Sequence, residues 1–98
     1  MGKDTLREGI CSEIARLLKE ERLRQKLSLN LLTARAGLSR QTLSFIEAGE
    51  RTPTIDTLLR LTEALGVKLE DLIRKARQRA MGNLGKGAER PKAKSENR

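Results

Sequence analysis

The sequence predicts an all-α protein built from five helices. Apolar residues recur three or four positions apart along most of the chain, which is the spacing of one helix face. Residues that favour helix starts precede these segments and glycines that favour helix ends follow them: Thr5, Ser28, Ser39 and Thr54 before, and Gly37, Gly49 and Gly66 after. No segment alternates apolar and polar residues as a half-buried strand does, so we expect no sheet.

The first helix is expected over residues 6–26. Its apolar positions follow the helical period: Leu6, Ile10, Ile14, Leu17 and Leu18. Thr5 and Glu8 have the spacing of a capping box at its start. Gly9 weakens the first turn, because glycine is a poor helix former.

Three shorter helices are expected next. Ser28 begins a helix over residues 29–36, and Ser39 begins another over residues 40–48. A loop that contains Pro53 precedes a helix from Thr54 to Gly66. The inner face of this helix is expected to carry Ile55, Leu58, Leu59, Thr62 and Leu65.

The last helix begins near Lys68 and keeps the helical period through Ala76. From Met81 onward the chain has three glycines, a proline and no apolar period. We therefore predict a folded domain over residues 1–80 and a disordered basic tail over residues 81–98.

The positive charge is concentrated at the C-terminal end. Residues 1–73 carry 12 basic and 11 acidic side chains, whereas residues 74–98 carry 9 basic and 2 acidic ones. A near-neutral body with a basic end favours an anionic partner for that end. A solvated end that keeps the protein soluble explains the charge equally well.

Composition excludes several classes of chemistry. The 98 residues include no histidine and one cysteine, Cys11. Zinc sites built from histidine and cysteine, and catalysis by a histidine-activated nucleophile, are therefore excluded within one chain. We expect no enzyme, no cofactor, no metal and no disulfide, with Cys11 acting as a small apolar residue of the first helix.

Membrane and export segments are also not expected. No apolar run approaches the roughly 20 residues that cross a bilayer. Met1–Glu8 lacks the apolar core of a signal peptide. The sequence therefore predicts a cytoplasmic protein.

The most informative segment is residues 28–48. Two short helices meet there at Gly37, and a tight turn that contains glycine is what a helix-turn-helix requires. Leu32, Leu38, Leu43 and Ile46 are positioned to pack the two helices together. The outer face of the second helix then carries Arg40, Gln41, Ser44 and Phe45.

Residues 27–49, with Arg51-Thr52-Pro53 and Asp56-Thr57-Leu58 after them, resemble the Xre/Cro type of phage-repressor-like helix-turn-helix. The likeness covers about residues 10–74. It is most specific in Ala36–Ser39, Ile46–Gly49 and the loop that follows. The resemblance implies a five-helix, lambda-repressor-like DNA-binding domain whose helix 40–48 enters the major groove of double-stranded DNA.

Carried over by this resemblance, Arg40, Gln41 and Phe45 fall at base-reading positions, with Ser44 beside them. Arg40 suits guanine and Gln41 suits adenine, while Phe45 fits against a thymine methyl. Three alternatives stay open. In the first, Arg40 contacts a phosphate in place of a base. In the second, Phe45 folds back and packs at the rim of the domain. In the third, Ser44 faces water.

Four further residues are candidates for phosphate contact: Ser28, Ser39, Arg51 and Thr52. The two serines lie at helix N-termini, where free N–H groups favour anions. Plain capping is compatible with that role. Arg51 and Thr52 lie in the loop where the family touches the DNA backbone.

Two positions depart from the family pattern, and one pair matches it. Leu29 stands where the family often has a phosphate-binding glutamine, and Thr33 stands where it usually has alanine. A threonine there either widens the helix crossing or bonds its hydroxyl to a backbone carbonyl. Arg22 and Glu47 match family positions that form a structural ion pair, which we expect to be partly buried here.

The resemblance implies a transcriptional regulator, most simply a repressor that acts by occupying its operator as a homodimer. The expected dimer surface is formed by the last two helices, near Leu61, Val67 and Leu69, unless these residues complete the core of the monomer. Two alternatives remain. One is an antitoxin that regulates its own gene and binds a protein partner through its last helix or tail. The other is a controller of restriction–modification genes.

Overall fold

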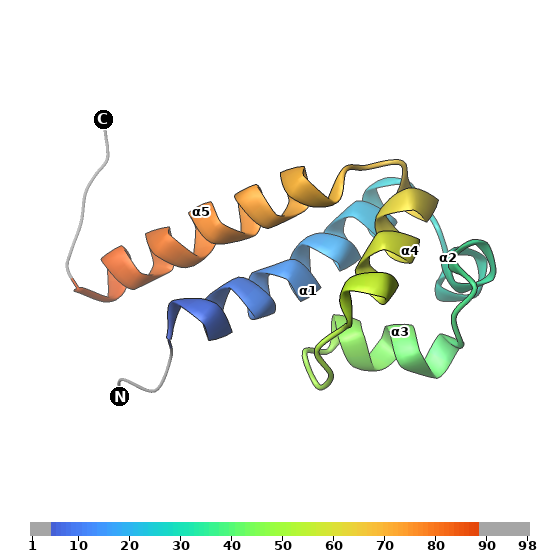
Figure 1. The fold of residues 1–98 in the computed structure, drawn as a ribbon, viewed down its shortest axis with the longest axis horizontal. Coiled ribbons are helices and arrows are strands. Elements are labelled where there is room, and N and C mark those ends of the chain that lie inside the picture. Colours follow the sequence, from blue (N-terminus) through green and yellow to red (C-terminus); the bar gives the residue numbers. More distant parts are fainter. Residues whose placement is uncertain (1–4, 89–98) are drawn as a thin grey trace.

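The computed structural model describes residues 5–88, with side chains described to residue 83. Five helices make up this part of the chain, which contains no strand (Figure 1). They are α1 (Leu6–Arg24), α2 (Leu29–Ala36), α3 (Arg40–Glu47), α4 (Ile55–Leu65) and α5 (Leu69–Ala88). The predicted all-α class is confirmed, and the starts of α1 to α4 agree with the sequence.

Side-chain caps begin the first four helices where the sequence placed them. Thr5 and Glu8 form the complete capping box of α1. Ser28, Ser39 and Thr54 each accept a hydrogen bond from the backbone N–H three residues ahead. These bonds satisfy donors that a helix start otherwise leaves unpaired.

The core is aliphatic and draws on all five helices. Its least exposed large side chains come from α1 to α4: Leu18, Leu32, Leu43, Ile46, Leu61 and Thr62. Leu72 and Ala76 extend the cluster along α5. With no large aromatic side chain in the cluster, the five helices pack through leucine and isoleucine.

The inner face of α4 differs from the expectation at its edges. Leu58, Thr62 and Leu65 are buried as predicted, but Ile55 is 63 % exposed and Leu59 is 42 % exposed. Leu61 completes the core instead, with no exposed surface. Of the two interpretations left open for Leu61, a dimer surface and the core of the monomer, the structure supports the core.

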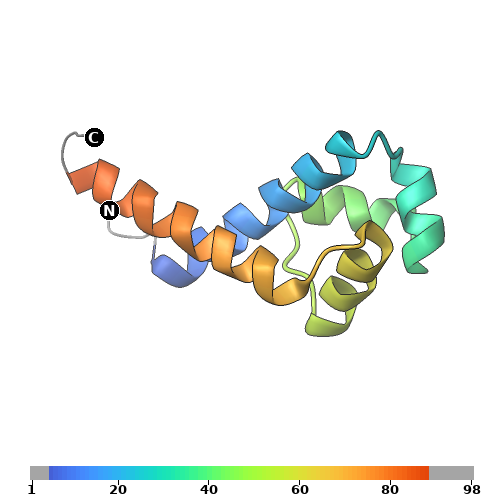
Figure 2. The ribbon, with the colours of Figure 1, turned by 90° about the horizontal axis from the view of Figure 1, so that it is seen from above.

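The helices α1 and α5 lie side by side and antiparallel over most of their length (Figures 1 and 2). Gly9 makes the close approach possible, since a Cβ on Gly9 would lie 3.2 Å from the Cβ of Ala80. Ala76 and Ala80 are both buried in this contact. The glycine that weakens the first turn of α1 therefore admits α5 to its surface.

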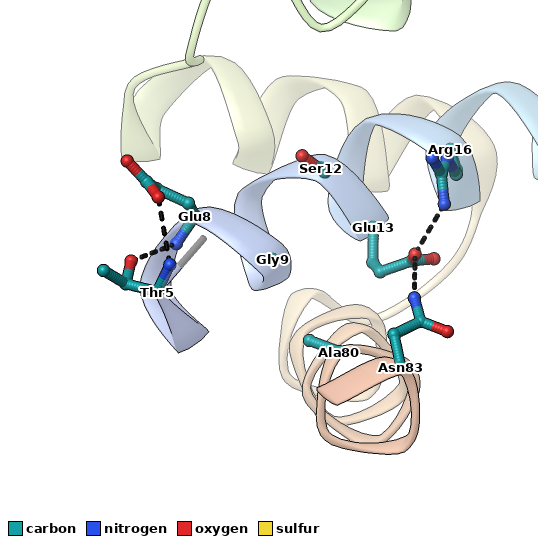
Figure 3. Close-up of a pocket in the computed structure, with 8 residues that line it drawn as sticks. All are labelled: Thr5, Glu8, Gly9, Ser12, Glu13, Arg16, Ala80 and Asn83. Atoms are coloured by element: carbon teal, nitrogen blue, oxygen red, sulfur yellow. Dashed lines mark hydrogen bonds and ion pairs between the residues drawn. The ribbon is translucent and has the colours of Figure 1, made fainter. Parts of the chain in front are cut away.

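The helix α5 continues to Ala88, whereas the sequence predicted disorder from residue 81. The amide of Asn83 donates to Glu13 at 3.1 Å, and Arg16 donates to the same carboxylate at 2.8 Å (Figure 3). Tertiary contact of this kind overrides the low helix propensity of the glycines in this stretch. The rest of the predicted tail, residues 89–98, lies outside the described residues.

The arrangement leaves α3 and α5 on different sides of α1. Helix α1 contacts both of them, while α2 packs against α3 and α4 (Figure 1). The outer face of α3 therefore points away from the basic helix α5.

Candidate nucleic-acid interface

The helices α2 and α3 form the predicted helix-turn-helix. Gly37 ends α2 with φ +72°, a left-handed conformation that glycine adopts without strain. The N–H of Leu38 donates to the carbonyl of Thr33 at 3.0 Å and closes the turn. Ser39 then begins α3 two residues after the glycine.

Packing between these helices follows the sequence closely. Leu32, Leu43 and Ile46 are almost completely buried, and Leu38 is packed against them. The buried Thr33 hydroxyl donates to the carbonyl of Leu29 at 2.8 Å and lies 3.1 Å from that of Asn30. The second of the two options for Thr33 is thus the one observed, and the hydroxyl keeps a partner inside the crossing.

Three polar side chains on the outer face of α3 have no partner among the described side chains. Arg40, Gln41 and Ser44 are exposed, and none of their side chains forms a hydrogen bond or ion pair with the residues whose side chains are described. The single acidic residue of α3 is Glu47, whose carboxylate is engaged elsewhere. Donors on this face are therefore free to reach an external acceptor.

The predicted pair of Arg22 and Glu47 is present and is almost completely buried. Nε and Nη2 of Arg22 donate to the two carboxylate oxygens of Glu47 at 2.8 and 2.9 Å. Nη1 donates to the carbonyl of Leu27 at 2.9 Å. These bonds to Glu47 raise the pKa of Arg22 above its usual value, against the opposing effect of burial. The pair fixes the end of α3 to α1.

The four candidates for phosphate contact are all exposed: Ser28, Ser39, Arg51 and Thr52. The hydroxyl of Ser39 also lies 2.7 Å from that of Thr42. Leu29 at the start of α2 is packed against the core rather than presented to solvent. The departure from the family's glutamine thus contributes to the apolar packing.

Phe45 and Arg51 lie together, which sequence reasoning did not predict. The Cζ atom of Arg51 stands 5.2 Å from the centre of the Phe45 ring, within the range of a cation–π contact. Phe45 is half-buried, so its side chain is only partly exposed to solvent. The sequence predicts separate roles for the two residues, because nothing in their spacing shows that the chain folds back after Gly49.

A cavity among the described side chains lies away from this face. It measures about 240 Å³ and lies between the first turns of α1 and the later part of α5, with Gly9, Glu13 and Asn83 among its lining residues. Its carboxylate Glu13 is engaged by Arg16 and Asn83 (Figure 3). No cluster of metal-ligating side chains occurs within the described part of the chain, and no helix there could span a membrane.

Comparison with known proteins identifies the family. A helix-turn-helix family model matches residues 18–72. An uncharacterised HTH-type transcriptional regulator, y4dJ of Sinorhizobium fredii (strain NBRC 101917 / NGR234), is 41 % identical over 68 residues. The match covers 69 % of this chain and 83 % of that protein.

Two solved structures share the fold. The restriction-modification controller protein C.AhdI from Aeromonas hydrophila is 27 % identical with a TM-score of 0.60, over 64 % of this chain and 94 % of that one. A single-substitution mutant of the restriction-modification controller protein C.Esp1396I is 22 % identical with a TM-score of 0.67, over 74 % and 91 % of the two chains. The chain therefore belongs to the Xre/Cro-like helix-turn-helix family of DNA-binding regulators.

Proposed function

We propose that α3 reads a specific operator in the major groove of double-stranded DNA. The observation that carries the proposal is that Arg40 and Gln41 on the outer face of α3 are exposed and have no partner among the described side chains. The buried Arg22–Glu47 pair meanwhile joins the end of α3 to α1. A rigid helix with free donors on one face suits direct readout of base edges. Arg40 suits guanine and Gln41 suits adenine, with Ser44 beside them.

Phosphate contacts hold α3 in register on the duplex. Ser28 and Ser39 lie at the N-termini of α2 and α3, where free N–H groups attract anions. Arg51 and Thr52 are exposed in the loop after α3 and supply two further contacts. Such contacts carry affinity and salt dependence but little sequence preference.

The regulator acts as a homodimer that reads two half-sites about one helical turn apart. The apolar side chains Ile55 and Leu59 of α4 support this, since they lie four residues apart on one exposed helix face. Leu59→Lys is expected to weaken self-association while leaving the monomer folded. Sedimentation equilibrium of wild type and variant measures this, and a wild-type protein that stays monomeric at high concentration, with and without operator DNA, refutes the dimer.

Repression by operator occupancy is the simplest mechanism for such a regulator, acting in the cytoplasm on the nucleoid. A second candidate is control of restriction–modification genes, which the likeness to the controller C.AhdI favours. An operator upstream of adjacent methyltransferase and endonuclease genes would support the second role. An operator upstream of unrelated genes would count against it.

Selection from random duplex DNA at near-physiological salt tests the proposal. The expected product is an enriched inverted repeat, which specific dimeric binding requires. Failure to enrich any sequence, together with binding that disappears as salt rises, would leave only electrostatic attraction to DNA.

A further inference from the structure

The single aromatic residue of the chain, Phe45, lies on the α3 face that we assign to DNA, and its ring already contacts another side chain. The Arg51 guanidinium stands 5.2 Å from the ring centre. This is the distance at which a ring attracts a cation through its negative face. Arg51 therefore contacts the ring before any thymine methyl can reach it.

The backbone between the two residues directs Arg51 to the ring. After α3 ends, the N–H of Gly49 donates to the carbonyl of Ile46 at 3.0 Å, and the N–H of Glu50 donates to that of Phe45 at 2.9 Å. Gly49 takes φ +77°, so the chain reverses at this point. The loop is thus tied to the residue whose ring Arg51 contacts.

Arg51 has no other partner among the residues whose side chains are described. It is exposed, and it donates no hydrogen bond and forms no ion pair there, although the carboxylate of Glu50 is its neighbour in sequence. An arginine side chain in a surface bend normally samples many rotamers, and ordering it on binding costs affinity. The ring of Phe45 restricts that sampling before DNA arrives.

We propose that Phe45 is a positioning residue for Arg51, holding the guanidinium beside the outer face of α3 so that it meets a DNA phosphate already ordered. The inference rests on the proposed function and deepens it, because it moves Phe45 from base reading to phosphate contact. It predicts that Phe45 contributes affinity that does not depend on the base sequence and that vanishes when Arg51 is absent.

A double-mutant cycle tests this on two duplexes, the selected operator and a scrambled sequence of equal length. Phe45→Leu is expected to weaken both complexes roughly two- to fivefold, the range of an exposed cation–π contact. In an Arg51→Ala background the same substitution is expected to have no further effect. Phe45→Tyr keeps the ring and is expected to keep wild-type affinity, and unfolding curves check that each variant is folded.

Two outcomes of the cycle overturn the proposal. Equal losses from Phe45→Leu with and without Arg51 would show that the two residues act independently. A loss confined to the operator, and abolished when uracil replaces thymine, would return Phe45 to base reading.

A measurement without DNA separates this inference from the proposed function. In the NMR spectrum of the full free chain, the δ protons of Arg51 are expected to be shifted upfield by the ring, a shift that Phe45→Leu removes and Phe45→Tyr retains. Absence of the shift overturns the inference even if operator binding is strong. A clear shift in a wild-type protein that binds no DNA shows instead that the proposed function has failed, and the DNA role of Phe45 with it.

Discussion

Removing the carboxylate of Glu47 gives the sharpest test of how α3 is anchored. The side chains of Arg22 and Glu47 are only 9 % and 7 % exposed, and two hydrogen bonds of 2.8 and 2.9 Å join them. Glu47→Ala leaves the buried guanidinium with the carbonyl of Leu27 as its one remaining partner. Breaking a buried pair in this way costs about 3–5 kcal/mol, because the other charge stays unpaired.

The matched control is an ion pair at the surface. Asp71 and Arg74 are joined in α5 with side chains 44 % and 59 % exposed, so Asp71→Ala is expected to cost less than about 1 kcal/mol. Urea unfolding followed by circular dichroism at pH 7 measures both variants. Glu47→Ala should also lower the melting temperature by more than about 10 °C, given the size of the domain.

A double replacement distinguishes an unpaired charge from general disruption of packing. Arg22→Met combined with Glu47→Leu removes both charges and keeps apolar volume, so most of the lost stability is expected to return. A stabilising role for the buried Arg22–Glu47 pair is refuted if Glu47→Ala costs no more free energy of unfolding than Asp71→Ala, or if the double variant is as unstable as Glu47→Ala alone.

Three further predictions concern the remaining contacts. Gly9→Val is expected to speed amide exchange in the later part of α5, because a Cβ at Gly9 would already lie 3.2 Å from the Cβ of Ala80. Gly82→Ala, which has open space around it, is expected instead to stabilise α5 by up to about 1 kcal/mol. Equal effects of the two variants would contradict a close contact between α1 and α5 at Gly9. Gly37→Ala is expected to lower the free energy of unfolding measured in urea by about 1–2 kcal/mol. The φ of Gly37 is +72°, and a guanidinium nitrogen of Arg60 would lie 3.0 Å from the added Cβ. An unchanged urea midpoint would show that the turn relaxes without cost. The hydrogen bond from Arg79 lowers the pKa of Glu20, so this contact contributes stability at neutral pH that is lost as the pH falls below about 4.5. Glu20→Gln is expected to reduce slightly the difference between the unfolding midpoints at pH 7 and pH 3.5, since Glu20 is half-exposed; a larger difference in the variant would contradict a stabilising contact.

Residues close together in the sequence determine where the helices begin, whereas tertiary packing determines the edges of their buried faces. Ser28, Ser39 and Thr54 cap helices at the predicted positions, because capping is decided by residues three apart in the chain. Helical periodicity gave the centre of the inner face of α4 but not its width. Whether Leu59 or Leu61 is covered depends on where α1 and α2 lie, and no pattern within α4 contains that information.

The same limit explains the two larger differences. The glycines after Met81 argue against a helix when read locally, yet α5 continues because Gly9, Glu13 and Asn83 bring it onto α1. The residues on the outer face of α3 followed from spacing alone, while the contact of Phe45 with Arg51 depends on the reversal at Gly49.

Repeating the DNA selection with variants of α3 tests whether this helix reads the bases of the operator. Gln41→Ala is expected to relax the preference at one base pair in each half-site and to lower operator affinity by about 1–3 kcal/mol. Arg77→Ala, an exposed change on α5 away from α3, is expected to leave the selected sequence unchanged. An operator consensus that Gln41→Ala and Arg40→Ala both leave intact would contradict the assignment of α3 as the helix that reads DNA.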